Sequence, residues 1–342
     1  MRTCARTGIV VLLTVVGGVA TSGSALSADQ AIVTEWLRDR ALPEVKKLSD
    51  KFRGDFTIET RGQGTTTEGG KTYKMTSHNF VRKTGRMYLI GSEETGGRSN
   101  VLQRVQGLNS KYFFELKRNK AGTAWLLSRV LENAPGTEFE QDRGVAELRS
   151  SIDGMTTMLT NLVLPHGIVP VDQVTSLPGF TLKSATLSGP NDQVLAIAFE
   201  YDHKDPESGK LCRPACTAEF DLGMYGIPKR YTEAVKTTTR ETVRDNSHEL
   251  IVTTDGIELR NKTSTRVVAG GQTTYASDNE ATAVTRFTRS PEPEFTLTAF
   301  GLPEPPGIEW GRSTPWYAWL AVAGVGCLAV FLVLRRVAAR RT

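Results

Sequence analysis

Cys212 and Cys216 are the residues of this sequence best suited to covalent chemistry. They stand in the segment Cys-Arg-Pro-Ala-Cys, and the other two cysteines lie in the apolar ends of the chain. In an oxidising compartment, two cysteines at this spacing favour a local disulfide. So small a ring would stabilise the fold by about 2 kcal/mol at most. The spacing therefore predicts a disulfide between Cys212 and Cys216.

Two other uses of the cysteine pair stay open. A redox pair usually has two intervening residues, whereas this pair has three. A zinc site would need further ligands, of which His203 is the nearest histidine in the sequence, and no second pair of closely spaced cysteines occurs. Both alternatives are therefore weaker than the disulfide.

No other motif of a catalytic, cofactor or metal site occurs. The segment from Gly62 to Thr72 resembles a phosphate-binding loop, but Thr65 stands where that motif requires glycine, so we expect a hairpin. The acidic segment from Asp202 to Lys210 lacks the spacing of an EF-hand and is typical of a solvated turn. The histidines stand singly, at His78, His166, His203 and His248. The sequence thus predicts no catalytic residue, cofactor or metal, although catalytic groups can converge from distant positions.

The two ends of the chain carry targeting signals. Residues 1–28 contain Arg2 and Arg6, an apolar run and then small residues, which is the build of a cleaved signal peptide. Residues 316–334 form an uncharged apolar stretch that is long enough to span a bilayer as a helix. Aromatic residues begin this stretch and arginines follow it, as in membrane anchors; they are Trp316, Tyr317, Trp319, Arg335, Arg336, Arg340 and Arg341.

The arginine asymmetry predicts the orientation of the chain. Positively charged residues favour the cytoplasmic side, so we expect residues 336–342 to be a cytoplasmic tail and residues 29–314 to lie outside the cytoplasm. Six of the 42 basic residues belong to the two ends, and all 37 acidic residues lie between them. The exported part is therefore close to neutral, which argues against a nucleic-acid partner.

The exported part has the pattern of an antiparallel β domain. Turn signals such as Gly69-Gly70, Asp255-Gly256 and Gly270-Gly271 separate short stretches that are rich in Thr, Val, Ile, Phe and Tyr. Two stretches instead show helical spacing: Ile32 to Phe52, as a kinked helix or two short ones, and about Asp142 to Leu164, which ends before Pro165.

This order of elements resembles the LolA-like periplasmic lipoprotein carriers over about residues 30–300. The resemblance implies a β-rich α+β fold, in which a large antiparallel curved sheet or half-barrel carries an N-terminal helix and one inserted helix. It also implies an apolar face that receives acyl chains or a hydrophobic protein segment. We therefore expect a signal peptide (1–28), an exported β-rich domain (29–300), a Pro/Gly-rich linker (301–314), one C-terminal transmembrane helix (315–335) and a basic tail (336–342).

The C-terminal cassette also resembles two kinds of bacterial tail. Pro303-Glu304-Pro305, followed by an apolar span and an arginine cluster, is similar to the PEP-CTERM sorting signals, although nine residues separate the motif from Pro315. The cassette is similar, too, to the tails of exported planctomycete proteins. Both resemblances imply a bacterial source and specify no chemistry.

Three hypotheses of function follow. The first is a membrane-tethered envelope binding module that holds a lipid, a lipoprotein or a hydrophobic protein segment. The second is a structural or sensory envelope protein without a small-molecule ligand, and the third, which the absence of motifs disfavours, is an extracytoplasmic enzyme. A large apolar pocket would favour the first, filled cores with flat surfaces the second, and a polar cleft with convergent titratable groups the third.

Overall fold

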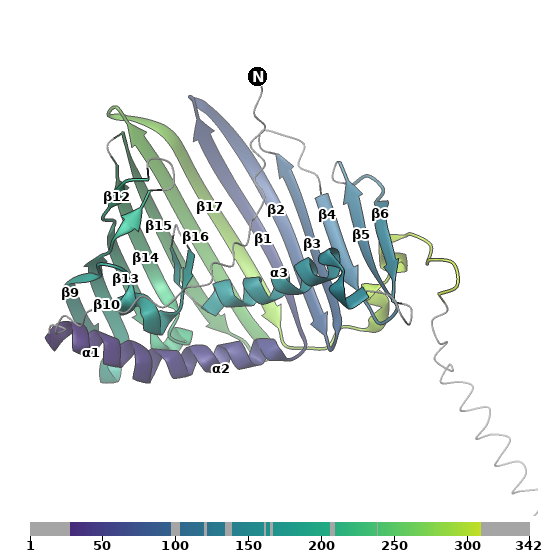
Figure 1. Cartoon of the computed structure of the whole chain (residues 1–342), viewed down its shortest axis with the longest axis horizontal. Coiled ribbons are helices and arrows are strands. Elements are labelled where there is room, and N and C mark those ends of the chain that lie inside the picture. Colours follow the sequence, from purple (N-terminus) through teal and green to yellow (C-terminus); the bar gives the residue numbers. More distant parts are fainter. Residues whose placement is uncertain are drawn as a thin grey trace, which may run out of the picture. The chain divides into compact units, whose positions relative to one another are not determined.

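The computed structural model describes residues 28–96, 103–119, 122–133, 139–160, 162–164, 167–205, 209–237 and 239–308 (Figure 1). The predicted signal peptide, except for Ala28, lies outside these residues, as do the predicted transmembrane helix and basic tail. Within the described part, no helix is both long and apolar enough to cross a bilayer.

The described residues form a large antiparallel sheet, as predicted, and strand clearly exceeds helix. Thirteen of the described strands belong to this sheet, in the order β6-β5-β4-β3-β2-β1-β17-β16-β15-β14-β13-β10-β9. Their bounds are β1 Phe56–Glu68, β2 Lys71–Thr84, β3 Met87–Gly96, β4 Gln103–Leu108, β5 Tyr112–Arg118, β6 Leu126–Glu132, β9 Thr181–Ser188, β10 Val194–Glu200, β13 Ala215–Asp221, β14 Pro228–Lys236, β15 Arg240–Val252, β16 Gly256–Ala269 and β17 Gln272–Arg286. Two short hairpins stand apart, formed by β7 (Leu162–Leu164) with β8 (Gly167–Val169) and by β11 (His203–Lys204) with β12 (Leu211–Cys212).

The chain divides into two compact units. The first unit lies within Met1–Leu48, Thr160–Ser247 and Val267–Gly271. The second lies within Ser49–Leu159, His248–Arg266 and Gln272–Thr342. Each unit has a buried core of its own, because large apolar side chains line one sheet face of the first unit and both faces of the second.

The core of the first unit follows from strict alternation along β10 and β13. Leu195, Ile197 and Phe199 lie on one face of β10 and are buried. On β13, Phe220 lies opposite Leu195, and Ala218 opposite Ile197, so both strands bury the same face. The other face carries small and polar residues, such as Ala196 and Ala198 on β10 and Thr217 and Glu219 on β13, as expected for an antiparallel sheet with one solvated side.

The N-terminal helix is kinked, as predicted. It consists of α1 (Ala28–Trp36), one turn of π-helix (Leu37–Ala41) and α2 (Leu42–Arg53). The buried residues of this segment recur at helical spacing, as Val33, Trp36, Leu37, Ala41, Val45, Leu48 and Phe52. The π-helical turn packs so closely on Gly226 that a Cβ atom there would lie 2.7 Å from the Ala41 carbonyl oxygen.

The second unit is built on the hairpin of β1 and β2. Its turn is Gly69-Gly70, with both residues at positive φ, so the segment that resembles a phosphate-binding loop is a hairpin, as predicted. We call the face that carries Tyr88, Leu108 and Phe113 the helix face, because Arg149 and Gly144 of α3 (Arg143–Thr160) contact Tyr88 and Phe113. The opposite face is called the open face.

The inserted helix is shorter than predicted. α3 ends at Thr160, whereas Leu162–Leu164 forms strand β7. The prediction of helix up to Leu164 was wrong because the apolar residues of β7 continue the helical spacing. Pro165 did not help to place the helix end, because proline is found both after helices and in hairpin turns.

The chain after β17 packs on the open face of the second unit. We call residues 291–308 the C-terminal strap. Phe295 and Leu297 of the strap are fully buried against open-face residues Phe80, Leu89, Val105, Tyr112, Phe114 and Leu116. Packing continues to Ile308, into the predicted linker.

Candidate functional site

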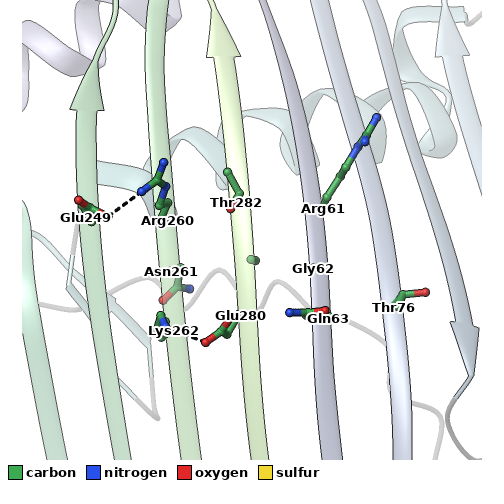
Figure 2. A pocket seen from close by; sticks show the side chains of 11 residues that line it. Arg61, Gly62, Gln63, Thr76, Glu249, Arg260, Asn261, Lys262, Glu280 and Thr282 are labelled. Atoms are coloured by element: carbon green, nitrogen blue, oxygen red, sulfur yellow. Dashed lines mark hydrogen bonds and ion pairs between the residues drawn. The ribbon is translucent and has the colours of Figure 1, made fainter.

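A shallow polar hollow of about 550 Å³ lies on the open face of the second unit (Figure 2). It is formed where β15, β16, β17, β1 and β2 run side by side beyond the strap-covered part of this face. The side chains that line it are Arg61, Gln63, Thr76, Glu249, Arg260, Asn261, Lys262, Glu280, Ala281 and Thr282. None of them is a large apolar residue.

The strand register explains why these side chains meet. Directly opposed residues of antiparallel strands share a face. Arg61 lies opposite Thr282 on β17 and opposite His78 on β2. Gln63, two residues on, lies opposite Glu280 and Thr76. Two cross-strand rows of polar residues thus form the floor of the hollow.

Both carboxylates of the hollow are ion-paired. Lys262 Nζ lies 2.7 Å from Glu280 Oε1, and Arg260 Nη1 lies 3.3 Å from Glu249 Oε2. The hydrogen bond from Lys262 holds the pKa of Glu280 below its ordinary value. Arg260 also contacts Glu258, which raises the pKa of the guanidinium. Glu280 is therefore held as a carboxylate, which suits charge complementarity better than proton transfer.

Arg61 differs from the other two cations of the hollow. No hydrogen-bond or ion-pair partner for its guanidinium is found among the described residues. The Nε2 atom of His78, in the opposite position on β2, is buried and likewise has no hydrogen-bond partner in this part of the chain. Arg61 is thus the cationic group of the hollow that is available to a ligand.

A second, smaller hollow of about 250 Å³ lies in the first unit. Its polar lining includes Thr186, Thr217 and Glu219. Arg230, also in the lining, is bound to Asp245 at 2.8 Å, and Glu219 lies 3.3 Å from Lys229. The open-face hollow therefore lacks the apolar lining that was predicted for acyl chains, and the second hollow is lined by small apolar and polar residues together.

The first unit also buries a polar cluster that the sequence did not reveal. The Tyr201 hydroxyl donates to Glu233 Oε1 at 2.9 Å, and the Tyr231 hydroxyl lies 3.5 Å from Cys216 Sγ. All four residues are nearly inaccessible to solvent. Burial raises the pKa of Glu233 to about 6, against the opposing effect of the Tyr201 hydrogen bond. The four residues come from two strands, β13 and β14, and a loop, so no local pattern could have found them.

The predicted disulfide is not formed in this structure. Cys212 and Cys216 are both free; Cys212 Sγ lies 3.3 Å from the His203 carbonyl oxygen, and Cys216 is buried beside Tyr231. Burial raises the pKa of both thiols, that of Cys216 to about 12, so both are held in the unreactive thiol form. The oxidation state of the pair in the exported protein stays a prediction.

The structure also bears on the zinc alternative and on the anchor. His203 lies opposite Cys212 in the β11–β12 hairpin, but among the described residues no three His, Cys, Asp or Glu side chains are placed to hold a metal ion. The predicted anchor residues lie outside the described residues: Trp316, Tyr317, Trp319, Arg335, Arg336, Arg340 and Arg341. Their role stays a prediction.

Comparison with known proteins finds similarity at the level of structure. No family model matches the sequence, and no curated protein matches it. One similar structure is a DUF1329 family protein from Desulfovibrio piger, with 11% identity, a TM-score of 0.31, and coverage of 77% of this chain and 98% of that chain. Another is a domain from Vibrio parahaemolyticus that is named for outer membrane lipoprotein sorting, with 10% identity, a TM-score of 0.31, and coverage of 77% and 99%. Both are likenesses of fold with low TM-scores, and one of them is to a domain named for lipoprotein sorting, the class of protein that the order of elements resembles.

Proposed function

We propose that this protein is a membrane-tethered binding module of the bacterial envelope, which holds its partner without covalent chemistry on the sheet of its exported part. The observation that supports this most is the open-face hollow, in which Arg61 is free to pair while both carboxylates are already neutralised. Such a site offers charge and hydrogen bonds but no nucleophile with an activating base. Binding fits it better than catalysis.

The partner classes in this proposal are a lipid, a lipoprotein or a hydrophobic protein segment. The fold likeness to a lipoprotein-sorting domain agrees with these classes but, at this TM-score, adds no weight to any of them. The polar lining of the hollow suits the headgroup of an amphipathic ligand. The tether itself is proposed from residues 315–341, whose apolar span ends in arginines.

A second candidate is a structural or sensory envelope protein without a small ligand. Two observations favour it. The strap covers the apolar cluster on the open face of the second unit, and the N-terminal helix has buried apolar residues along its length. A face that is already covered has no apolar surface left for an acyl chain.

Native mass spectrometry separates the two candidates. The full chain would be extracted from its host membranes in a mild detergent and desorbed intact, together with a similarly tagged single-pass membrane protein as a control for adventitious lipid. The binding proposal expects one additional mass, in stoichiometric amount, that the control lacks. Bare protein, or the same lipid mixture on both proteins, would contradict it and favour the structural role.

A further inference from the structure

The edge strand β6 begins with two adjacent leucines that are exposed to solvent. Leu126 is 64% exposed and Leu127 is 48% exposed. The other exposed large apolar residues in the described part of the chain stand singly along the sequence, which is normal for a protein surface. Residues 122–128 carry no charge, although charged side chains commonly protect the edges of sheets. An uncharged apolar strand end of this kind indicates contact with another apolar surface.

Trp125, directly before the leucines, joins them to the C-terminal strap. Its ring centroid lies 6.1 Å from that of Phe300 in the strap, in an edge-to-face contact, and the Arg118 guanidinium lies 4.2 Å from the ring centroid of Trp125. Trp125 and Ile308 of the strap both pack against the open-face cluster. Figure 1 shows the strap leaving the sheet beside β6. We call Trp125, Leu126 and Leu127 the edge patch, and it lies at the edge of the second unit from which the chain leaves toward the proposed anchor.

The length of the remaining chain holds this edge close to the proposed anchor. Ile308 is the last residue that the structure describes, and six residues, 309–314, separate it from Pro315, which precedes the apolar span. Fully extended, this connection reaches about 25 Å. A seven-residue strand such as β6 has about the same length. A unit tethered so closely presents to the lipid the side from which its tether leaves, and this side carries the edge patch.

The chemistry of the edge patch fits a lipid surface better than an added β-strand. The amphipathic ring of tryptophan favours the membrane interface, and leucine side chains gain free energy when they leave water. A further strand would have to pair with β6 along its outer edge. The pairing of β6 with β5 shifts register, so that Ser128 is an extra residue between Leu127 and Arg129. Such a bulge bends an edge strand and disfavours the addition of another strand.

We infer that the edge patch is a lipid-contact surface, with which the second unit rests on the bilayer that holds the anchor. This inference rests on the membrane tether of the proposed function and adds a second point of contact with the same membrane. The tether alone leaves the second unit free to turn, whereas two contacts hold the β6 edge of its sheet toward the lipid.

Quenching of tryptophan fluorescence by brominated lipid tests the contact. The full chain is reconstituted into vesicles of phosphatidylcholine and phosphatidylglycerol, with or without bromine on the acyl chains of the phosphatidylcholine, and flotation shows whether it is membrane-bound. The emission of Trp125 is the difference between each protein and the same protein with Trp125→Phe. The test variant is Leu126→Glu, which places a charge in the edge patch. The matched control is Leu211→Glu, at a leucine that is 68% exposed in the first unit, and unchanged melting temperatures show that both variants fold.

The expected result is that brominated lipid quenches most of the Trp125 emission in the wild type and in Leu211→Glu. Leu126→Glu should lose this quenching, because a charged side chain is costly to bring into lipid. Absence of quenching in a wild-type chain that floats with the vesicles, equal quenching in Leu126→Glu, or an equal loss in Leu211→Glu would overturn the inference and leave the tether standing. A chain that does not float would contradict the tether and the inference together.

Sedimentation in mild detergent tests the competing use of the edge. The inference expects Leu126→Glu to have the same oligomeric state as the wild type. A wild-type dimer that dissociates in Leu126→Glu, combined with unquenched Trp125 in vesicles, would assign the edge patch to pairing with a second copy and overturn the lipid contact.

Discussion

Glu233 is a carboxyl group buried beside two tyrosines of the first unit, and no ion pair to it is found in the part of the chain that the structure describes. Burial raises its pKa from 4.5 to about 6, so its protonated form is favoured in the folded state. The stabilisation that this group provides is complete below pH 4.5, where it is protonated in both states, and it is lost as the pH rises through 6. The free energy of unfolding should therefore fall by about 2 kcal/mol between pH 4 and neutral pH because of this one group, whose pKa rises by between one and two units on folding.

Glu233→Gln is therefore expected to stabilise the protein at pH 7.5 by about 2 kcal/mol relative to its effect at pH 4. Glutamine keeps the size of the side chain and can still accept the Tyr201 hydrogen bond, but it does not ionise. Urea unfolding at a series of pH values measures the difference. Glu241→Gln, at an exposed position on β15, is the control and should show no such dependence. A flat profile for both variants would contradict a raised pKa at Glu233.

The cysteine pair gives a second prediction for single residues. If the chain is exported as proposed, Cys212 and Cys216 should be oxidised to each other, although both are thiols in this structure. Alkylation of the protein under non-reducing conditions, followed by peptide mass spectrometry, distinguishes the two states. Alkylated Cys212 and Cys216 in freshly isolated envelopes would refute the disulfide, and the same peptides after reduction serve as the positive control.

At the residue scale, the sequence revealed groups that are close along the chain and missed groups that the sheet brings together. The Cys212–Cys216 pair was visible because its members are four residues apart. Arg61, Thr282 and Glu233 carry no local signature, because their partners come from strands distant in the sequence. Only the strand register identifies them, and register depends on how the whole sheet is assembled.

At the scale of elements, glycine-rich turn motifs located the hairpins correctly, whereas apolar spacing misplaced the end of a helix. Gly69-Gly70 and Gly270-Gly271 adopt the positive φ angles that tight hairpins need, and both hairpins were predicted. The end of α3 was misplaced because apolar spacing alone does not separate a helix end from the short strand β7. The short strands β4 and β13 were not predicted individually.

The hydroxyl of Tyr112, on β5, joins the C-terminal strap to the sheet through two hydrogen bonds. The Tyr112 hydroxyl accepts from Leu297 N at 3.0 Å and donates to the Glu304 carboxylate at 2.5 Å. Asn109 Nδ2 adds a hydrogen bond to the Phe295 carbonyl. Tyr112 is fully buried, and burial raises its pKa, so the hydroxyl keeps its proton at neutral pH.

Tyr112→Phe should therefore loosen the strap while leaving its apolar packing in place. The loss of a buried hydroxyl with two partners should cost about 1–3 kcal/mol. Hydrogen exchange should become faster at Leu297 and Thr298, whose amides donate to Tyr112 and Glu304. Tyr275→Phe, on β17, is the control. Equal exchange of these two amides in wild type and Tyr112→Phe would show that the hydroxyl does not hold the strap.

At the scale of the whole molecule, the docked strap limits the distance between the second unit and the proposed anchor. The strap packs up to Ile308, and six residues separate it from Pro315, where the apolar span begins. Even fully extended, this connection reaches only about 25 Å. The sequence predicted a longer linker, which began at residue 301. Because residues 301–308 belong to the strap, the proposed module lies nearer to the bilayer than that longer linker would allow.

The proposed topology makes the last prediction, which tests the anchor and the strap together. Protease added to intact spheroplasts should digest the exported part, and an epitope placed after Arg341 should survive, because the arginines hold the tail in the cytoplasm. Residues 295–297 of the strap should resist cleavage, because they are buried and the Leu297 amide is hydrogen-bonded to Tyr112. Spheroplasts opened with detergent control for access to the epitope. Loss of the epitope from intact spheroplasts would reverse the topology, whereas early cuts within residues 295–297 of the wild type would contradict a docked strap and leave the topology standing.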